Sequence, residues 1–247
     1  MSDSIIAGRH AVKELLRSDS DINKIYIQDT VNKSQLKEIL DLAKEQKVVV
    51  STVPKNKIDG LTDERHQGIA AMVSAHEYMP LETLLETIEG KDANVIILDG
   101  LEDPHNLGSI LRSCDAAGFD AVIIPKRRSV QLTDTVAKTS TGAIEYVPVV
   151  RVTNINQTID KLKENNFWVI GSDGTGTLDY REMNAKSGST ALVVGSEGEG
   201  ISKKTLEKCD FTVKIPMTGE ITSLNASVSA ALLMYEVYRQ QNPLGRD

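Results

Sequence analysis

The chain has 247 residues, of which 40% are hydrophobic, and a formal net charge of −7. This length is enough for one large domain, or for a large domain and a small one, with a sizeable buried core. The longest apolar run is far too short to span a membrane, the N-terminus has no signal-peptide pattern, and two cysteines make no disulfide framework. We therefore expect a soluble, reduced, cytoplasmic protein without a membrane segment or a metal site.

The first 75 residues alternate helical and strand patterns and hold eleven Lys and Arg against eleven Asp and Glu, so the rest of the chain carries the whole −7. Hydrophobic periodicity predicts helices over 5–17 and 34–46, and strands over 24–27, 48–51 and 68–75. We therefore predict a small α/β domain over residues 1–75. Residues 76–91 are acidic and nearly free of strand pattern, which indicates a linker with some helix.

The second domain, residues 92–247, contains six apolar runs typical of buried strands. They lie at 94–99, 121–125, 146–150, 167–173, 191–197 and 211–216. Helical segments separate most of these runs. The alternation predicts an α/β fold with a mostly parallel sheet and helices on both of its faces.

Three polar stretches follow strands of this domain. In the first, 98–119, Pro104 suits the first turn of a helix. Helical spacing then predicts one buried face, formed by Leu107, Ile110, Leu111, Cys114 and Ala117. Arg112 lies away from that face, near Gly108 and Ser109, where a missing side chain leaves room. An ordinary solvated arginine is the alternative interpretation of Arg112.

The second stretch, "LVVGSEGEGIS" (192–202), has glycines between a strand and a helix. Gly195, Gly198 and Gly200 permit positive φ and the close approach of a ligand. Glu197 disfavours a bound phosphate and favours a ligand with hydroxyl groups or positive charge. A plain strand–helix turn is the alternative.

The third stretch, 214–240, runs from a strand through a polar loop into a long helix. It holds more hydroxyl and amide side chains than a helix cap needs. The main chain of Met217 and of 223–227 could present N–H and C=O groups to a ligand. The alternative is a well-capped surface helix.

All three stretches leave strands at their carboxyl ends, where ligands of open α/β sheets bind. Together they resemble the motifs of the SPOUT-class, SpoU/TrmH-type ribose 2′-O-methyltransferases of RNA. Asn106 with Arg112, "VVGSEGEGIS" and "IPMTGEITSLNASVSAALLMYE" carry this resemblance, which covers Val95 to about Tyr238. The first domain resembles the small RNA-binding domain of the subgroup acting on large-subunit ribosomal RNA, with "RHQGIAA" (65–71) typical of that subgroup.

The resemblance implies a C-terminal trefoil knot that binds S-adenosylmethionine, a homodimer, and 2′-O-methylation of a guanosine in 23S ribosomal RNA. It implies catalytic roles for Asn106, Arg112, Glu197, Ser223 and Asn225. It implies cofactor binding by Gly195, Ile215, Pro216, Met217 and Leu224.

Two groups of cations are candidates for RNA contact. Arg9, His10, Lys13 and Arg17 lie close together on the first helix, and Lys126, Arg127 and Arg128 follow the strand 121–125. Ordinary solvated charges are the alternative for each of them. Phosphate contacts would fix the register of the RNA without reading its sequence.

Three alternatives to methylation of ribosomal RNA are open from the sequence. A Rossmann-type oxidoreductase is disfavoured because no GxGxxG follows the first strand and no acidic residue sits at the ribose distance. A non-catalytic RNA-binding protein that retains the knot is disfavoured by the intact catalytic set. A transfer-RNA guanosine is the main alternative substrate, but the family members that modify it lack a comparable N-terminal domain.

Overall fold

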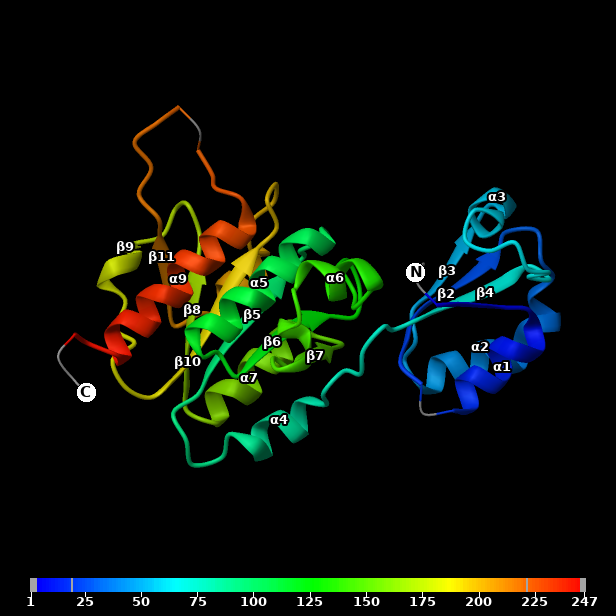
Figure 1. Cartoon of the computed structure of the whole chain (residues 1–247), viewed down its shortest axis with the longest axis horizontal. Coiled ribbons are helices and arrows are strands. Elements are labelled where there is room, and N and C mark those ends of the chain that lie inside the picture. The colour runs from blue at the N-terminus through cyan, green and yellow to red at the C-terminus, as the bar shows by residue number, and fades with distance from the viewer. Residues whose placement is uncertain (1–3, 19, 221, 245–247) are drawn as a thin grey trace. The chain divides into compact units, whose positions relative to one another are not determined.

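The computed structural model of the chain describes residues 4–18, 20–220 and 222–244. Its contacts divide the chain into two compact units (Figure 1). The first comprises Met1–Glu77 together with Gln131–Asp134, and the second comprises Tyr78–Val130 and Thr135–Asp247.

The first unit has a four-stranded sheet in the order β1-β4-β2-β3, in which β2 and β3 are parallel and the other pairs antiparallel. Its elements are β1 (Ile5–Ala7), α1 (Arg9–Arg17), β2 (Ile22–Gln28), η1 (Lys33–Leu36), α2 (Lys37–Glu45), β3 (Val50–Val53), α3 (Lys55–Asp59) and β4 (Ile69–Val73). Helices α1 and α2 bury Val12, Leu16, Ile39 and Ala43 in one core with the sheet residues Ile25, Ile27, Ile69 and Ala71.

The helix predicted over 5–17 is wrong at its start, because 5–7 form the edge strand β1. Gly8 has a φ of 96°, which interrupts the helix, and Ile5 pairs with Met72 of β4. The β-branched pair Ile5–Ile6 fits a strand better than a helix. Helix α3, which follows Pro54, is not among the elements predicted for this domain.

The second unit has a seven-stranded parallel sheet in the order β7-β6-β5-β10-β8-β11-β9. Its strands are β5 (Asn94–Asp99), β6 (Ala121–Pro125), β7 (Val149–Val152), β8 (Phe167–Ser172), β9 (Leu178–Asp179), β10 (Ser189–Gly195) and β11 (Phe211–Lys214). Its helices are α4 (Leu81–Thr87), α5 (Pro104–Ala117), α6 (Asp134–Thr139, its first residue grouped with the first unit), η2 (Ala143–Glu145), α7 (Ile155–Glu164), η3 (Tyr180–Glu182), α8 (Lys203–Leu206) and α9 (Ala226–Gln241). The predicted α/β fold with a mostly parallel sheet is confirmed.

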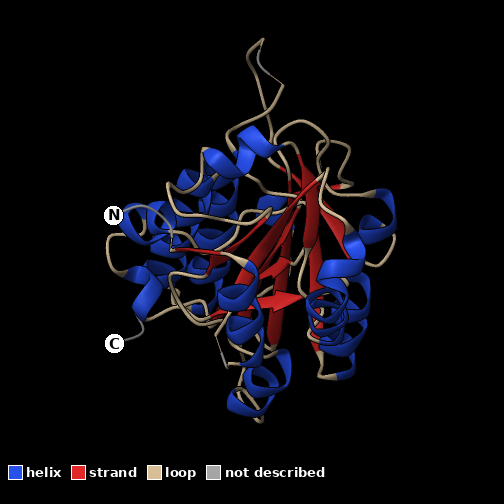
Figure 2. Cartoon of the chain, turned by 90° about the vertical axis from the view of Figure 1, so that its right-hand side faces the viewer, coloured by secondary structure: helices blue, strands red, loops and turns tan. Residues whose placement is uncertain are grey.

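Helices cover both faces of this sheet, as Figure 2 shows for the red strands between blue helices. Residues Leu84 of α4 and Ile159 of α7 share a core with Val95 and Ile97 of β5. On the other face α5 packs against α9, where the Cys114 thiol lies 3.4 Å from the sulfur of Met234. The predicted buried face of α5 is confirmed, since all five of its residues are buried.

Residues 76–91 were expected to be a linker, but most of them pack on the second unit. Leu81, Leu84 and Ile88 are buried in its core, and Met79 forms a parallel bridge with Val150 of β7. Two of the segment's acidic residues, Glu82 and Glu86, are exposed on α4. No helix in the described part of the chain is long and apolar enough to cross a membrane. The trefoil knot stays a prediction.

Candidate active site

The three polar stretches all begin at the carboxyl edge of the parallel sheet. Gly195, the last residue of β10, lies in register with Asp99, the last residue of β5. Strand β11 ends at Lys214 and feeds the loop that leads to α9. Because these strands are parallel, their following segments meet at one edge, as the sequence predicted.

Asn106, Glu197 and Asn225 come from the three stretches and form one hydrogen-bonded cluster. One oxygen of Glu197, Oε1, accepts from Asn106 Nδ2 at 3.0 Å, from Asn225 Nδ2 at 2.6 Å and from the Ala226 N–H at 3.2 Å. Asn225 Nδ2 also donates to Asn106 Oδ1 at 2.9 Å. The structure therefore brings together three of the five predicted catalytic residues.

Local structure holds each member of this cluster. Asn225 is the N-cap of α9, and its Oδ1 accepts from the N–H of Ser227 at 3.0 Å, which turns its amide nitrogen toward Glu197. Asn106 lies in the first turn of α5, whose N-cap Asp103 accepts from the His105 N–H at 2.9 Å. The two helix starts thus hold Asn106 and Asn225 where both amides donate to the Glu197 carboxylate.

A cavity of about 370 Å³, the α9 cavity, opens beside this cluster. Its walls come from residues 172–175, 194–200, 215, 217, 222–224, 226 and 229. Four of the five predicted cofactor residues line it: Gly195, Ile215, Met217 and Leu224. Ser223 lines it as well, whereas Pro216 does not appear in its walls.

The glycines of the second stretch have different roles from those expected. A Cβ at Gly195 would lie 2.0 Å from the carbonyl carbon of Gly200, so the residue is small because the chain folds back on itself. The backbone N–H groups of Ser196 and Gly200 donate to each other's carbonyls at 3.2 and 3.0 Å. Gly200 has a φ of 66°, whereas Gly198 has open space around it. Gly195 is therefore required by the close approach of backbone to backbone, and the close approach of a ligand stays a prediction.

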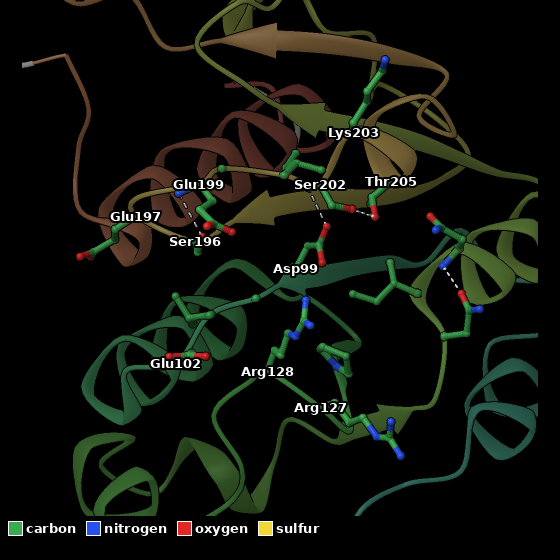
Figure 3. A pocket seen from close by; sticks show the side chains of 18 of the residues that line it. Asp99, Glu102, Arg127, Arg128, Ser196, Glu197, Glu199, Ser202, Lys203 and Thr205 are labelled. Atoms are coloured by element: carbon green, nitrogen blue, oxygen red, sulfur yellow. Dashed lines mark hydrogen bonds between the residues drawn. The ribbon is translucent and has the colours of Figure 1, made fainter.

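A larger groove of about 850 Å³, the α7–α8 groove, lies on the other side of the 196–200 turn. Figure 3 shows its polar side chains, with Arg128 extending toward Asp99 and Arg127 extending away from it. Lys203 of α8 adds a third cation, and Glu102 and Glu199 are among the carboxylates. The groove and the α9 cavity share Ser196, Glu197, Glu199 and Gly200 as a wall.

Of the three cations predicted at this edge, Arg127 and Arg128 line the groove, while Lys126 does not. The backbone N–H of Lys126 instead continues the sheet by donating to Val152 O at 2.8 Å. Arg128 has a φ of 52°, which is uncommon for a residue with a side chain. Strained backbone of this kind is often found at functional sites.

Sequence reasoning missed several residues of these walls. Asp173 follows β8, and its side chain accepts from the Thr175 N–H at 2.8 Å at the edge of the α9 cavity. Asn154 caps α7 at the rim of the α7–α8 groove, and Asp99 accepts from the Ser202 N–H at 3.0 Å. The signal was present, since "GSDGTG" (171–176) is a glycine-rich segment after a strand.

Arg112 lies apart from the cluster. It is exposed and lines a shallow hollow with Ser109, Ser113, Ala116 and Tyr235. Arg112 is six positions along the α-helix from Asn106, which corresponds to about 9 Å along the axis and about 120° around it. The space expected at Gly108 is also filled, because a Cβ there would lie 2.0 Å from Thr139 Oγ1.

The four cations predicted on α1 are not equally available. The side chains of Lys13 and Arg17 both contact Glu38 Oε1 of α2, at 2.7 and 2.9 Å. Arg9 donates from its backbone N–H to Gln67 Oε1 at 3.2 Å, and His10 is exposed. Within the described ranges, no group of three or more His, Cys, Asp or Glu side chains is placed to hold a metal ion.

Comparison with known protein families gives two matches that together span most of the chain. Residues 93–235 match the SpoU rRNA Methylase family, and residues 5–79 match the domain described as RNA 2′-O ribose methyltransferase substrate binding. The first match covers the first two polar stretches and the third as far as residue 235.

A full-length relative is known from Staphylococcus saprophyticus subsp. saprophyticus, with the name "Putative TrmH family tRNA/rRNA methyltransferase". It is 55% identical over 247 residues, which cover 99% of each chain. A protein of the same name from Staphylococcus epidermidis is 56% identical over 246 residues, which cover 99% of this chain and 98% of that one.

Among solved structures, the SpoU methyltransferase AviRb from Streptomyces viridochromogenes, in complex with the cofactor AdoMet, has a TM-score of 0.61. It is 23% identical, and the match covers 99% of this chain and 92% of that one. At this identity the likeness concerns the fold. The fold and the family matches agree: the chain belongs to the SpoU rRNA methylase family, a family of RNA methyltransferases.

Proposed function

We propose that this protein transfers a methyl group from S-adenosylmethionine to the ribose 2′-hydroxyl of a guanosine in 23S ribosomal RNA, in the cytoplasm. The observation that carries the proposal is the Asn106–Glu197–Asn225 cluster, which stands where the α9 cavity meets the α7–α8 groove. A transfer reaction needs a donor site and an acceptor site that share a wall, and the 196–200 turn is such a wall.

The α9 cavity suits the methyl donor. Ile215, Met217 and Leu224 line it, and their main chain would offer N–H and C=O groups to the edge of an adenine. The carboxylate of Glu197 suits a ligand with positive charge. S-adenosylmethionine supplies such a charge as a sulfonium, which carries the methyl group and leaves as a neutral thioether.

The α7–α8 groove suits the acceptor nucleotide. Arg127 and Arg128 are exposed in it, and arginine binds phosphate oxygens through two parallel N–H donors. In the transfer the 2′-oxygen would form a bond to the methyl carbon as the carbon–sulfur bond breaks, and the hydroxyl proton would pass to solvent water. Orientation of the hydroxyl toward the shared wall is therefore the main task of the protein.

Arg112 would reach this reaction from a second copy of the chain. Within one chain it lies about 120° around α5 from Asn106. It lines a hollow with Tyr235 of α9, a helix that exposes four apolar side chains: Val228, Leu232, Tyr235 and Tyr238. Their spacing of three to four residues forms a stripe that a second copy would cover. In this homodimer Arg112 would bind the phosphate next to the acceptor and stabilise the alkoxide that develops on the 2′-oxygen.

Methyl transfer to purified RNA tests the proposal. Protein-free 23S ribosomal RNA and transfer RNA would each be incubated with the protein and S-adenosylmethionine labelled in the methyl group, with Arg112→Ala as the matched control. We expect label in 2′-O-methylguanosine from 23S ribosomal RNA. Label in a base methyl group would exclude ribose chemistry, and label confined to transfer RNA would exclude the proposed substrate.

A further inference from the structure

The first unit contains a cavity of about 740 Å³ that the candidate active site does not use. We call it the 65–68 cleft, because the loop Arg65, His66, Gln67 and Gly68 forms one of its walls. Arg9 and Lys55 supply further cations at its rim. The cleft lies entirely within the first unit.

The buried His66 holds the floor of this cleft. Its Nδ1 accepts from the Gly68 N–H at 2.9 Å, which places the ring proton on Nε2, 2.9 Å from Asp59 Oδ1. The second oxygen of Asp59 lies 3.1 Å from Lys55 Nζ. The hydrogen bond from His66, and then the one from Lys55, lower the pKa of Asp59. The carboxylate is therefore ionised at neutral pH and already partnered, so it does not repel an anion as a free carboxylate would.

The same loop fixes Arg9. Gln67 has a φ of 51°, and its carbonyl accepts from Arg9 Nε at 3.4 Å, while its Oε1 accepts from the Arg9 backbone. Gly68 has a φ of 78°, and a Cβ there would lie 2.1 Å from Val31 Cγ2. Position 68 therefore requires glycine. Both terminal amino groups of Arg9 have no partner among the described residues. Arg65 is exposed and makes no hydrogen bond or ion pair to the described residues.

Lys13 and Arg17 of α1 differ from the two arginines of the cleft in their partners. An RNA phosphate that bound Lys13 or Arg17 would have to displace Glu38, which already neutralises both. Such exposed ion pairs are weak, so displacement is feasible, but it would release few counterions. Glu64 also lines the cleft, but neither Arg9 nor Arg65 forms an ion pair with the described residues, so a phosphate bound there displaces no paired carboxylate.

We propose that the 65–68 cleft binds the sugar–phosphate backbone of RNA, with Arg9 and Arg65 as its phosphate contacts. The inference rests on the proposed function only in taking RNA as the substrate. Of the four cations that the sequence suggested on α1, it keeps Arg9, and it adds Arg65 in place of Lys13 and Arg17. Guanidinium groups held in position bind phosphate with two parallel hydrogen bonds and lose little side-chain freedom on binding.

The test compares two full-length variants that each remove one arginine from the first unit, Arg65→Ala and Arg17→Ala. Binding to protein-free 23S ribosomal RNA would be measured at several salt concentrations between about 50 and 300 mM. We expect Arg65→Ala to weaken binding by about five- to thirtyfold and to reduce the slope of log affinity against log salt by about 0.7 to 0.9. Arg17→Ala should keep the slope and stay within about twofold of wild type.

An unchanged slope in Arg65→Ala would overturn the inference, as would an equal loss in both variants, which would indicate a contact without preference for the cleft. Thermal unfolding of both variants checks that the unit is intact. The outcome is independent of the chemistry: a protein that binds RNA through Arg65 but transfers no methyl group would refute the proposed function and support the cleft. If the Arg65→Ala variant binds RNA with unchanged affinity and transfers methyl groups at the normal rate, the cleft is refuted and the proposed function is supported.

Discussion

Asn225 Nδ2 lies 2.6 Å from Glu197 Oε1, while Oδ1 of the same amide accepts from the N–H of Ser227 at 3.0 Å. One side chain therefore caps α9 and holds the carboxylate of the cluster. The capping bond fixes which end of the amide faces Glu197, so helix formation and site geometry depend on each other. Asn225 therefore has a role beyond capping the helix.

Two substitutions at Glu197 separate its charge from its hydrogen bonds. In Glu197→Gln an oxygen remains to accept from Asn106, Asn225 and Ala226, so the free energy of unfolding should change by less than about 0.5 kcal/mol. In Glu197→Ala these three donors lose their acceptor, and because the site is exposed to water the loss should be about 1 kcal/mol. Denaturant unfolding measures both values.

If the carboxylate attracts the sulfonium, both substitutions should weaken S-adenosylmethionine binding by about tenfold, or about 1.4 kcal/mol. Titration calorimetry measures this affinity. Wild-type affinity in Glu197→Gln would show that the negative charge has no part in donor binding.

The glycines of the second stretch provide a matched pair. Gly195→Ala places a Cβ 2.0 Å from the carbonyl carbon of Gly200, so the 196–200 turn must move. We expect a loss of about 1 to 3 kcal/mol in stability and at least about a tenfold loss of S-adenosylmethionine affinity. Gly198→Ala meets nothing within 4 Å and should leave both quantities close to wild type. Equal effects at the two positions would mean that the turn is not a rigid wall.

Arg112→Lys should be nearly as damaging as Arg112→Ala, because lysine keeps the charge but loses the planar pair of donors. We expect methyl transfer to fall by about a hundredfold or more, with S-adenosylmethionine affinity unchanged. A near wild-type rate in Arg112→Lys would rule out the bidentate role.

Mixing two inactive subunits tests whether Arg112 acts on the cluster of its own chain or on that of the partner. If Arg112 acts on the partner's cluster, subunits with Arg112→Ala and Glu197→Ala should together form one intact site in each mixed dimer. Random association then restores about a quarter of the wild-type rate. If Arg112 acts within its own chain, both sites of the mixed dimer are broken and the mixture stays inactive.

The half-buried thiol of Cys209 should react slowly at neutral pH. The pKa of Cys209 is raised to about 11, and burial of the thiol is the largest cause of this rise. Only the thiolate form is nucleophilic. Because the folded-state pKa is raised, the thiolate fraction should rise about tenfold per pH unit across pH 7 to 9.5. Mass spectrometry of iodoacetamide-treated protein measures the rate; a plateau near pH 9 would contradict the raised pKa. Burial also raises the pKa of Cys114, which should stay unmodified until the protein unfolds.

The sequence was sufficient for features that depend on local periodicity. The bounds of β5 and β6 and the buried face of α5 follow from runs and spacings that neighbouring residues determine. The edge strand β1 was missed because Ile5–Ala7 continue an apolar pattern into a helix, and only pairing with β4 distinguishes strand from helix. Tertiary contacts of this kind override local preference.

In the candidate site, too, local patterns were sufficient for some features and tertiary contacts decided the others. The strand ends predicted that Asn106, Glu197 and Asn225 would lie at one edge, since parallel strands bring their following loops together. The position of Arg112 was not predictable, because the space beside Gly108 is filled by Thr139, a residue 31 positions away in the chain. The pairing of Lys13 and Arg17 with Glu38 likewise depends on how α1 packs against α2.

Mapping of 2′-O-methyl marks tests the central claim most directly. A 2′-O-methyl group removes the hydroxyl that attacks the neighbouring phosphodiester, so a modified nucleotide resists cleavage by alkali. Ribosomal and transfer RNA from cells with and without this protein would be compared in this way, with cells carrying only Arg112→Ala as control. We expect one guanosine of 23S ribosomal RNA to lose its protection both without the protein and with Arg112→Ala. Unchanged 23S protection, with a mark lost from transfer RNA instead, would contradict the account.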